Sequence, residues 1–296
     1  MTIENPLTPW TALSPSRLLC VPWGVAFGLT DVGLVRAGNE DNFLIDEALG
    51  LVMVADGMGG HAAGAVASAA ALMAVRQFLQ RAAIDVMLNE VQNETPGADA
   101  AATLNQRDPE ATGSDPNTPT VSRLIDAINF ANAELYAQNL NQGRPQGGMG
   151  TTLTGVWQGD CNEDLIYFHV GDSRLYRCRS GALIQLTRDQ TLYQQALDRG
   201  AIENLPPRNL LLQAVGPASD VVPEIRALRV ERNDLLMLCS DGLHGSVPHG
   251  DIEQALAVAT ESTLEKTCTQ LIELAKEYGS RDNITVLLVW CGAASA

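Results

Sequence analysis

The feature that most constrains this chain is a short apolar run that ends in a carboxylate and several glycines. Residues 51–55 are all apolar, and Asp56-Gly57 follows them at once. A run this short, closed by a turn signal, predicts a buried strand rather than a helix. The glycines at 57, 59 and 60 let the backbone approach a ligand closely, because they carry no Cβ atom. A carboxylate and nearby carbonyl groups that face one small object favour a hard cation.

The same combination of apolar run and aspartate recurs three times. One run leads into Asp241, another leads into Gly171-Asp172, and Asp282 opens a run that extends to Trp290. A single Asp-Gly pair is typical of an ordinary turn. Four such strands in one compact domain would bring their carboxylates together, and converged carboxylates repel unless metal ions or protons lie between them. The repetition therefore favours a metal site.

Composition excludes several classes of function. The 296 residues carry a net charge of −16 and only two lysines, so no basic face indicates a nucleic acid or an anionic membrane as a partner. No secretory signal and no apolar run of about 20 residues is visible, and we expect a cytoplasmic protein. The six cysteines form no Cys-x-x-Cys pair and are predicted to be buried free thiols.

One domain is expected over residues 23–292. Residues 1–22 contain four prolines and no clear periodicity, which indicates a leader that lies against the domain or is loose in solvent. Residues 89–119 are rich in Asn, Thr, Pro, Asp, Gly and Ala and are predicted to be a flexible insertion. Strands and helices occur in blocks, which favours antiparallel sheets covered by helices. Helices are predicted over residues 60–81, 120–141, 190–200, 249–259 and 263–278.

Six short motifs follow one another along the chain: Arg36-x-x-Asn39-Glu40-Asp41, Asp56-Gly57-Met58-Gly59-Gly60-His61, Gly150-Thr151-Thr152, Gly171-Asp172-Ser173-Arg174, Ser240-Asp241-Gly242 and Arg281-Asp282-Asn283. Each motif is weak alone, but six in this order are very specific. With them, the chain from about Trp23 to Trp290 resembles the bacterial form of the metal-dependent PP2C-type (PPM) serine/threonine phosphatases. The resemblance implies an α+β fold, a four-layer α/β/β/α sandwich of two central antiparallel sheets flanked by helix pairs, with a metal site at one edge.

The resemblance also implies a reaction, the hydrolysis of phosphoserine and phosphothreonine in phosphorylated proteins by a water that bridges two divalent ions. Oxygen ligands of this kind suit Mn²⁺ or Mg²⁺. The metal ligands would be Asp56, which bridges both ions, the Gly57 carbonyl, Asp241 and Asp282. Glu40 and Asp41 would hold metal-bound waters, and the planar guanidinium of Arg36 would orient the phosphate.

Two departures from the family pattern affect individual residues. Met58 stands where animal members have a histidine that is thought to act as general acid. His61 is a candidate for that role, and the alternative is a structural histidine at a helix start. Gly245 stands where many members have an acid that helps to hold a third ion together with the residue equivalent to Asp172. We expect Asp172 to bind a weaker third ion, or else to accept hydrogen bonds in a turn.

Two other functions stay open at this stage. The first is a non-catalytic phosphoprotein-binding regulatory module, which the complete set Arg36, Asp56, Asp241 and Asp282 argues against. The second is a small-molecule phosphomonoesterase, which a deep apolar pocket beside the carboxylates would favour. The chain contains neither an Asp-x-Asp motif nor a P-loop, so an aspartyl-phosphate route and P-loop nucleotide binding are not indicated. No sequence feature indicates an oligomeric state.

Overall fold

The computed structural model describes residues 13–60, 62–93, 119–144, 148–159 and 165–292. Two antiparallel sheets form the centre of this part of the chain. One sheet has the order β1 (Leu19–Val21), β2 (Gly24–Asp31), β12 (Ile284–Cys291), β11 (Leu235–Cys239), β8 (Arg174–Arg179) and β9 (Ala182–Gln185). The other has the order β10 (Glu224–Leu228), β7 (Leu165–Val170), β6 (Leu153–Trp157), β4 (Leu51–Met58) and β3 (Asp41–Asp46), with β5 (Gly150–Thr151) paired to the end of β4.

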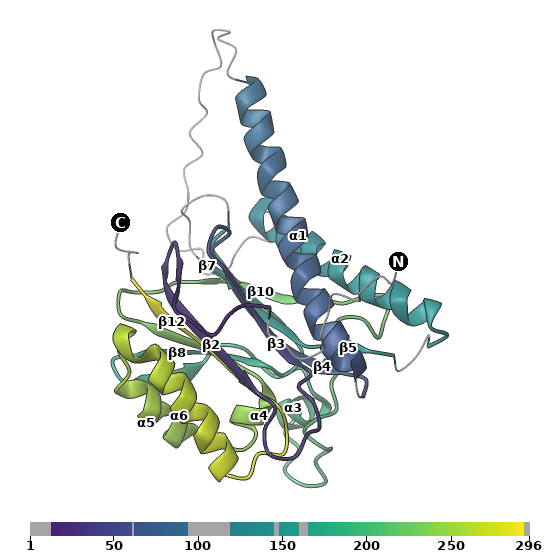
Figure 1. Cartoon of the computed structure of the whole chain (residues 1–296). Coiled ribbons are helices and arrows are strands. Elements are labelled where there is room, and N and C mark those ends of the chain that lie inside the picture. Colours follow the sequence, from purple (N-terminus) through teal and green to yellow (C-terminus); the bar gives the residue numbers. More distant parts are fainter. Residues whose placement is uncertain (1–12, 61, 94–118, 145–147, 160–164, 293–296) are drawn as a thin grey trace, which may run out of the picture.

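The two sheets pack face to face, and helices cover both outer faces. Figure 1 shows α1 (Ala62–Asn93) and α2 (Pro119–Asn141) on one side, and α5 (His249–Ala257) and α6 (Leu264–Glu277) on the other. The central layer includes Phe43, Val54 and Leu238, and separate buried clusters lie beneath each pair of helices. This arrangement confirms the predicted four-layer sandwich.

Burial between layers explains why the sequence shows unbroken apolar runs instead of alternation. Every residue of β6, β7 and β11 is buried, because one face of each strand meets the opposite sheet and the other meets helices. Apolar and polar residues alternate in strands that have one solvent-exposed face. These strands lack that alternation because both of their faces are buried inside the sandwich.

The first helix ends later than the sequence predicted. We expected it to stop at Arg81, but α1 continues to Asn93, and Figure 1 shows its far end extending beyond the sheets. Residues 82–93 contain neither glycine nor proline, so nothing in them interrupts a helix. The rest of the predicted insertion, residues 94–118, lies outside the described residues, as do His61 and Cys161.

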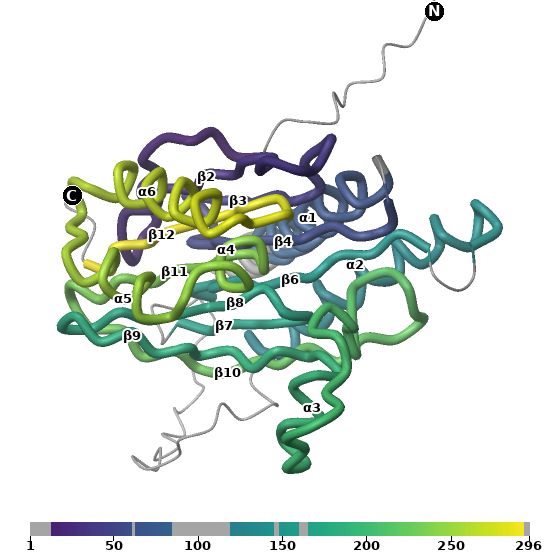
Figure 2. The backbone as a smooth tube through the Cα atoms, turned by 90° about the horizontal axis from the view of Figure 1, so that it is seen from below, coloured from purple at the N-terminus to yellow at the C-terminus, as the bar shows by residue number. Residues whose placement is uncertain are grey.

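The remaining segments agree more closely with expectation. Residues 13–22 of the predicted leader lie against the domain, because β1 pairs with β2 and the Ser14 Oγ donates to the Ile45 carbonyl. A short helix, α3 (Leu192–Asp198), falls within the predicted range 190–200. Figure 2 shows α3 projecting away from both sheets. No helix among the described residues is both long and apolar enough to cross a membrane.

A buried asparagine supports the first prediction of an effect on stability. The Asn139 Nδ2 donates to the carbonyls of Met149 (2.8 Å) and Gly216 (3.0 Å), and its Oδ1 accepts from the Met149 N–H (2.9 Å). Replacing Asn139 with alanine leaves three backbone groups without partners, and we expect a loss of about 3 kcal/mol in unfolding free energy. Urea denaturation measures this loss. The exposed Asn141 at the end of the same helix is the control, and Asn141→Ala should change stability by less than about 0.5 kcal/mol.

Candidate metal centre

The aspartates predicted from the strand ends converge at one edge of the sandwich. A depression of about 250 Å³ is lined by Asp56, Asp172, Asp241 and Asp282, together with Glu40 and Arg36. Asp56 lies near the end of β4, Asp172 lies just beyond β7, and Asp282 lies just before β12. Asp241 begins the single-turn helix α4 (Asp241–His244), at the edge of the sandwich marked by that label in Figure 1. Residues from both sheets therefore contribute to one depression.

Two adjacent threonines fix the backbone of Asp56. The Thr151 Oγ1 and the Thr152 N–H both donate to the Asp56 carbonyl (2.9 Å each), and the Asp56 N–H donates to the Thr152 Oγ1 (2.9 Å). The Thr152 hydroxyl also lies 2.7 Å from the Ser173 Oγ, in the turn that carries Asp172. One threonine thus connects the strand of Asp56 to the turn of Asp172.

Gly57 lies in a space that no side chain could share. A Cβ atom at this position would lie 2.1 Å from the Gly64 carbonyl oxygen and 2.6 Å from that of Glu40, both of them backbone atoms. The Gly57 N–H donates to the Glu40 carbonyl (3.2 Å), which holds the end of β4 against the segment that precedes β3. The start of α1 therefore packs directly onto the strand end that carries Asp56.

Asp41 lies directly across the β3–β4 pair from Asp56 and is almost completely buried. Its Oδ2 accepts hydrogen bonds from the Ser240 Oγ (2.6 Å) and the Thr285 Oγ1 (2.7 Å). Ser240 immediately precedes Asp241 in the sequence. The buried Asp41 carboxylate therefore connects the two sheets directly behind the depression.

The loop that carries Arg36 is anchored by Asn283. The Asn283 side chain accepts from the Glu40 N–H (2.9 Å) and donates to the carbonyls of Val32 (3.0 Å) and Gly38 (2.8 Å). At the tip of this loop, the Arg36 Nη2 lies 2.7 Å from the Asp282 Oδ2. Arg36 is about half exposed, and its guanidinium borders the depression.

The carboxyl groups of the depression have raised pKa values, because they are buried near one another with little positive charge to balance them. Burial and the surrounding acids raise the pKa of Asp56 well above its usual value. Burial, and then the charge of Asp282, raises the pKa of Asp241 to about 6, and burial with the charge of Asp241 raises that of Asp172 to about 7. Such shifts mean that the ionised forms are disfavoured until a cation neutralises them.

The residues present fit a divalent cation. The Asp241 Oδ1 is buried and has no hydrogen-bond partner among the described residues, although a buried carboxylate oxygen normally has one. In this arrangement no three acidic, His or Cys side chains of the described ranges are grouped closely enough to enclose one ion. The Asp282 Oδ2 is paired with the Arg36 Nη2 instead.

Sequence reasoning identified the acids but not the residues that hold them. Thr152, Ser240 and Asn283 all lie within the quoted motifs, yet their contacts join segments that are far apart in the chain. His244 had no sequence signal, although its Nε2 lies 3.0 Å from the Asp172 carbonyl oxygen and connects α4 to the Asp172 turn. The candidate general acid His61 lies outside the described residues.

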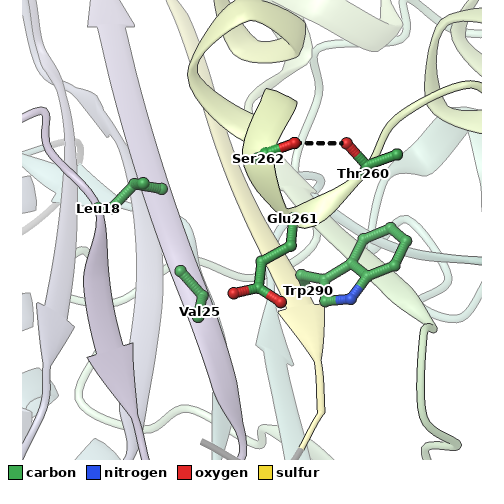
Figure 3. Close-up of a pocket in the computed structure, with 6 residues that line it drawn as sticks. All are labelled: Leu18, Val25, Thr260, Glu261, Ser262 and Trp290. Carbon is green, nitrogen blue, oxygen red and sulfur yellow. Dashed lines mark hydrogen bonds between the residues drawn. The ribbon is translucent and has the colours of Figure 1, made fainter. Parts of the chain in front are cut away.

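A second depression, of about 440 Å³, lies away from these acids (Figure 3). It lies between β2, β12 and the turn that precedes α6, and its walls include Leu18, Val25 and Trp290. Glu261 is the one acid that lines it, and none of the predicted site residues does. The carboxylate depression is therefore the candidate site.

Comparison with known proteins gives consistent results. A sequence model of the family described as Protein phosphatase 2C matches residues 36–288. The serine/threonine phosphatase stp of Listeria innocua is 35% identical over 271 residues, covering 88% of this chain and 93% of that protein. The serine/threonine protein phosphatase PstP of Mycobacterium tuberculosis is 33% identical over 264 residues, covering 88% of this chain and 43% of that protein.

Solved structures agree with the sequence comparisons. The crystal structure of Mycobacterium tuberculosis PstP/Ppp aligns with a TM-score of 0.69 at 30% identity, covering 90% of this chain and 97% of that chain. The catalytic domain of PstP in complex with two manganese ions aligns with a TM-score of 0.65 at 32% identity, covering 89% of this chain and 96% of that chain.

Proposed function

The chain belongs to the protein phosphatase 2C family of metal-dependent serine/threonine phosphatases, and we propose that Asp56, Gly57, Asp241 and Asp282 hold the divalent ions on which its activity depends. As a member of this family, the protein is an enzyme that hydrolyses phosphoserine and phosphothreonine monoesters in proteins. The observation that best supports the ligand assignment is the buried, unpartnered Asp241 Oδ1 among the other carboxylates.

Phosphate monoester hydrolysis is very slow without a catalyst, largely because a nucleophile must approach a dianion. When bound, two ions of Mn²⁺ or Mg²⁺ supply positive charge that makes water a better nucleophile at neutral pH and stabilises the phosphoryl charge. Asp56 is suited to contribute to both ions, because its backbone is fixed by Thr151 and Thr152 and its side chain faces the depression. Asp172 lines the same depression and is a candidate ligand for a weaker third ion.

The remaining residues position substrate and water. Arg36 is suited to bind the phosphate through its planar guanidinium once Asp282 is committed to an ion. Glu40 borders the depression and is placed to orient water molecules. Asp41 is placed to act through its links to Ser240 and Thr285, since it lies behind the depression. His61 is proposed as the proton donor to the leaving alkoxide.

The lining of the depression favours a protein substrate over a small molecule. Of its thirteen lining residues, Met58 and Leu211 are the large apolar ones, and the rest are charged, polar or glycine. Small-molecule sites are usually enclosed by apolar walls that bury most of the ligand. A phosphorylated side chain presented by a protein needs no such enclosure.

Hydrolysis of a phosphothreonine peptide, with and without Mn²⁺, tests the proposed function. We expect release of phosphate that depends on the metal and stops when a chelator is added. A protein that binds Mn²⁺ but hydrolyses neither this peptide nor p-nitrophenyl phosphate would be a non-catalytic binding module instead.

Arg36 provides a separate prediction for substrate binding. A bidentate hydrogen bond to phosphate is worth about 1.5–3 kcal/mol, so Arg36→Ala should lower kcat/KM for the peptide by about 10- to 100-fold, mainly through KM. Arg36→Lys should recover part of this loss, because it keeps the charge but not the planar fork. Steady-state kinetics at saturating Mn²⁺ measures both. An unchanged KM with weaker Mn²⁺ binding would mean that Arg36 acts through Asp282 instead.

A further inference from the structure

A groove continues from the metal centre toward the turn that precedes Asp282. It has a volume of about 720 Å³ and shares Arg36, Asp241 and Asp282 with the carboxylate depression. A phosphorylated side chain bound at the metal centre is short, so the polypeptide that carries it must lie close to this groove. On the side of the metal centre that faces the turn before Asp282, the groove is therefore the first surface that a substrate chain would contact.

The floor and walls of the groove leave room for an extended chain. Gly242, Gly245 and Gly279 contribute backbone without side chains. Ser280 is buried and donates its hydroxyl hydrogen to the Gly242 carbonyl (2.8 Å), so it is not available to a ligand. Tyr278 stands half exposed at the side of the groove.

Charge distinguishes this groove from the rest of the acidic protein. Its two carboxylates, Asp241 and Asp282, are those it shares with the metal centre. Two arginines also line it: Arg36, which is paired with Asp282, and Arg281. Arg281 is exposed and makes no hydrogen bond or ion pair with any described residue. By contrast, Arg174 and Arg179 are each paired with an aspartate. An exposed arginine with no partner among the described residues thus lines a groove that a substrate must approach.

We infer that Arg281 forms a subsite for an acidic residue, an Asp or Glu near the phosphorylated residue of the substrate protein. This inference rests on the proposed function and specifies the class of phosphoprotein that the site accepts. Because Arg281 has no partner in the described part of the chain, it gives up no ion pair there when it binds a carboxylate of the substrate. The chain's net charge of −16 repels acidic segments in general, so a local cation would be needed to admit one here.

The test compares phosphothreonine peptides that differ in one residue. A peptide with alanine at all flanking positions is compared with peptides that carry one Asp, or one Lys, at each position within three residues of the phosphothreonine. For the native enzyme with Mn²⁺, an Asp on one side should raise kcat/KM about three- to fivefold over alanine, as expected of a partly exposed ion pair. This preference should decrease as the ionic strength rises.

Variants assign the preference to Arg281. Arg281→Gln should remove the preference for Asp, and Arg281→Glu should reverse it in favour of Lys. For each variant, kcat/KM for a peptide is divided by kcat/KM for p-nitrophenyl phosphate, which has no flanking residues. Arg232 is the matched control, because it is also an exposed arginine but precedes β11, at the end opposite to Asp241. Arg232→Gln should retain the native preference.

The outcomes separate this inference from the function on which it rests. If all peptides are hydrolysed equally, or if Arg281→Glu keeps the preference for Asp, the subsite is wrong and the phosphatase assignment stands. If no phosphopeptide is hydrolysed in the presence of Mn²⁺, the proposed function fails and the subsite fails with it.

Discussion

Asp241→Asn should lower kcat/KM by about 10³-fold at the Mn²⁺ concentration that saturates the native enzyme, which corresponds to about 4 kcal/mol of transition-state stabilisation. The amide keeps the size of the carboxylate but removes the negative charge that a divalent ion needs. The buried Oδ1 of Asp241 has no partner among the described residues, so no internal hydrogen bond is lost at that atom. Initial rates with a phosphothreonine peptide measure the effect.

The fold should survive this substitution. Burial and neighbouring acids disfavour the ionised Asp241, so a neutral amide relieves repulsion in the metal-free protein. The metal-free variant should therefore unfold at the same temperature as the native protein or higher. Asp220→Asn, at an exposed carboxylate away from the depression, is the control and should keep full activity. If Asp241→Asn retained more than about a tenth of native activity, Asp241 would not be a ligand of the catalytic ions.

Gly57→Ala should inactivate the enzyme through the backbone rather than through charge. The Cβ atom of an alanine at position 57 would lie 2.1 Å from the Gly64 carbonyl oxygen. Backbone atoms cannot rotate aside as a side chain can. Either β4 or the start of α1 must move, which displaces Asp56. We expect a loss of at least about 100-fold in kcat/KM and a decrease of about 3 kcal/mol in unfolding free energy. Kinetics and urea denaturation of the same preparation measure the two effects.

Gly250→Ala is the matched control for this prediction. A Cβ atom at Gly250 meets nothing within 4 Å, and the residue lies in α5, where alanine is favoured over glycine by about 1 kcal/mol. This variant should be as active as the native enzyme and slightly more stable. A Gly57→Ala variant with native activity and stability would show that the end of β4 tolerates a shift of Asp56.

The acids of the site were predictable because each one is marked locally. An apolar strand with an aspartate at one end can be recognised from the sequence alone, and the layered fold then brings Asp56, Asp172, Asp241 and Asp282 to one edge. The end of α1 was also encoded locally, since no helix breaker occurs between Arg81 and Asn93. The change in composition near residue 89 does not end the helix, which continues to Asn93.

The support of the site was not predictable in the same way. The contact of Thr152 with Asp56 joins residues 96 positions apart, and that of Asn283 with Glu40 joins residues 243 positions apart. The pairing of Arg36 with Asp282 likewise depends on how two loops meet after folding. Propensity and periodicity describe neighbours along the chain, so such contacts require the three-dimensional structure.

The most direct test of the metal assignment is anomalous diffraction from crystals of the protein grown with Mn²⁺. We expect two manganese peaks in the carboxylate depression, with oxygen ligands from Asp56, Asp241 and Asp282, and with Asp282 released from Arg36. Manganese bound elsewhere in the protein would contradict the metal assignment. It would also be contradicted if Asp282 stayed paired with Arg36 in crystals that hydrolyse phosphopeptide.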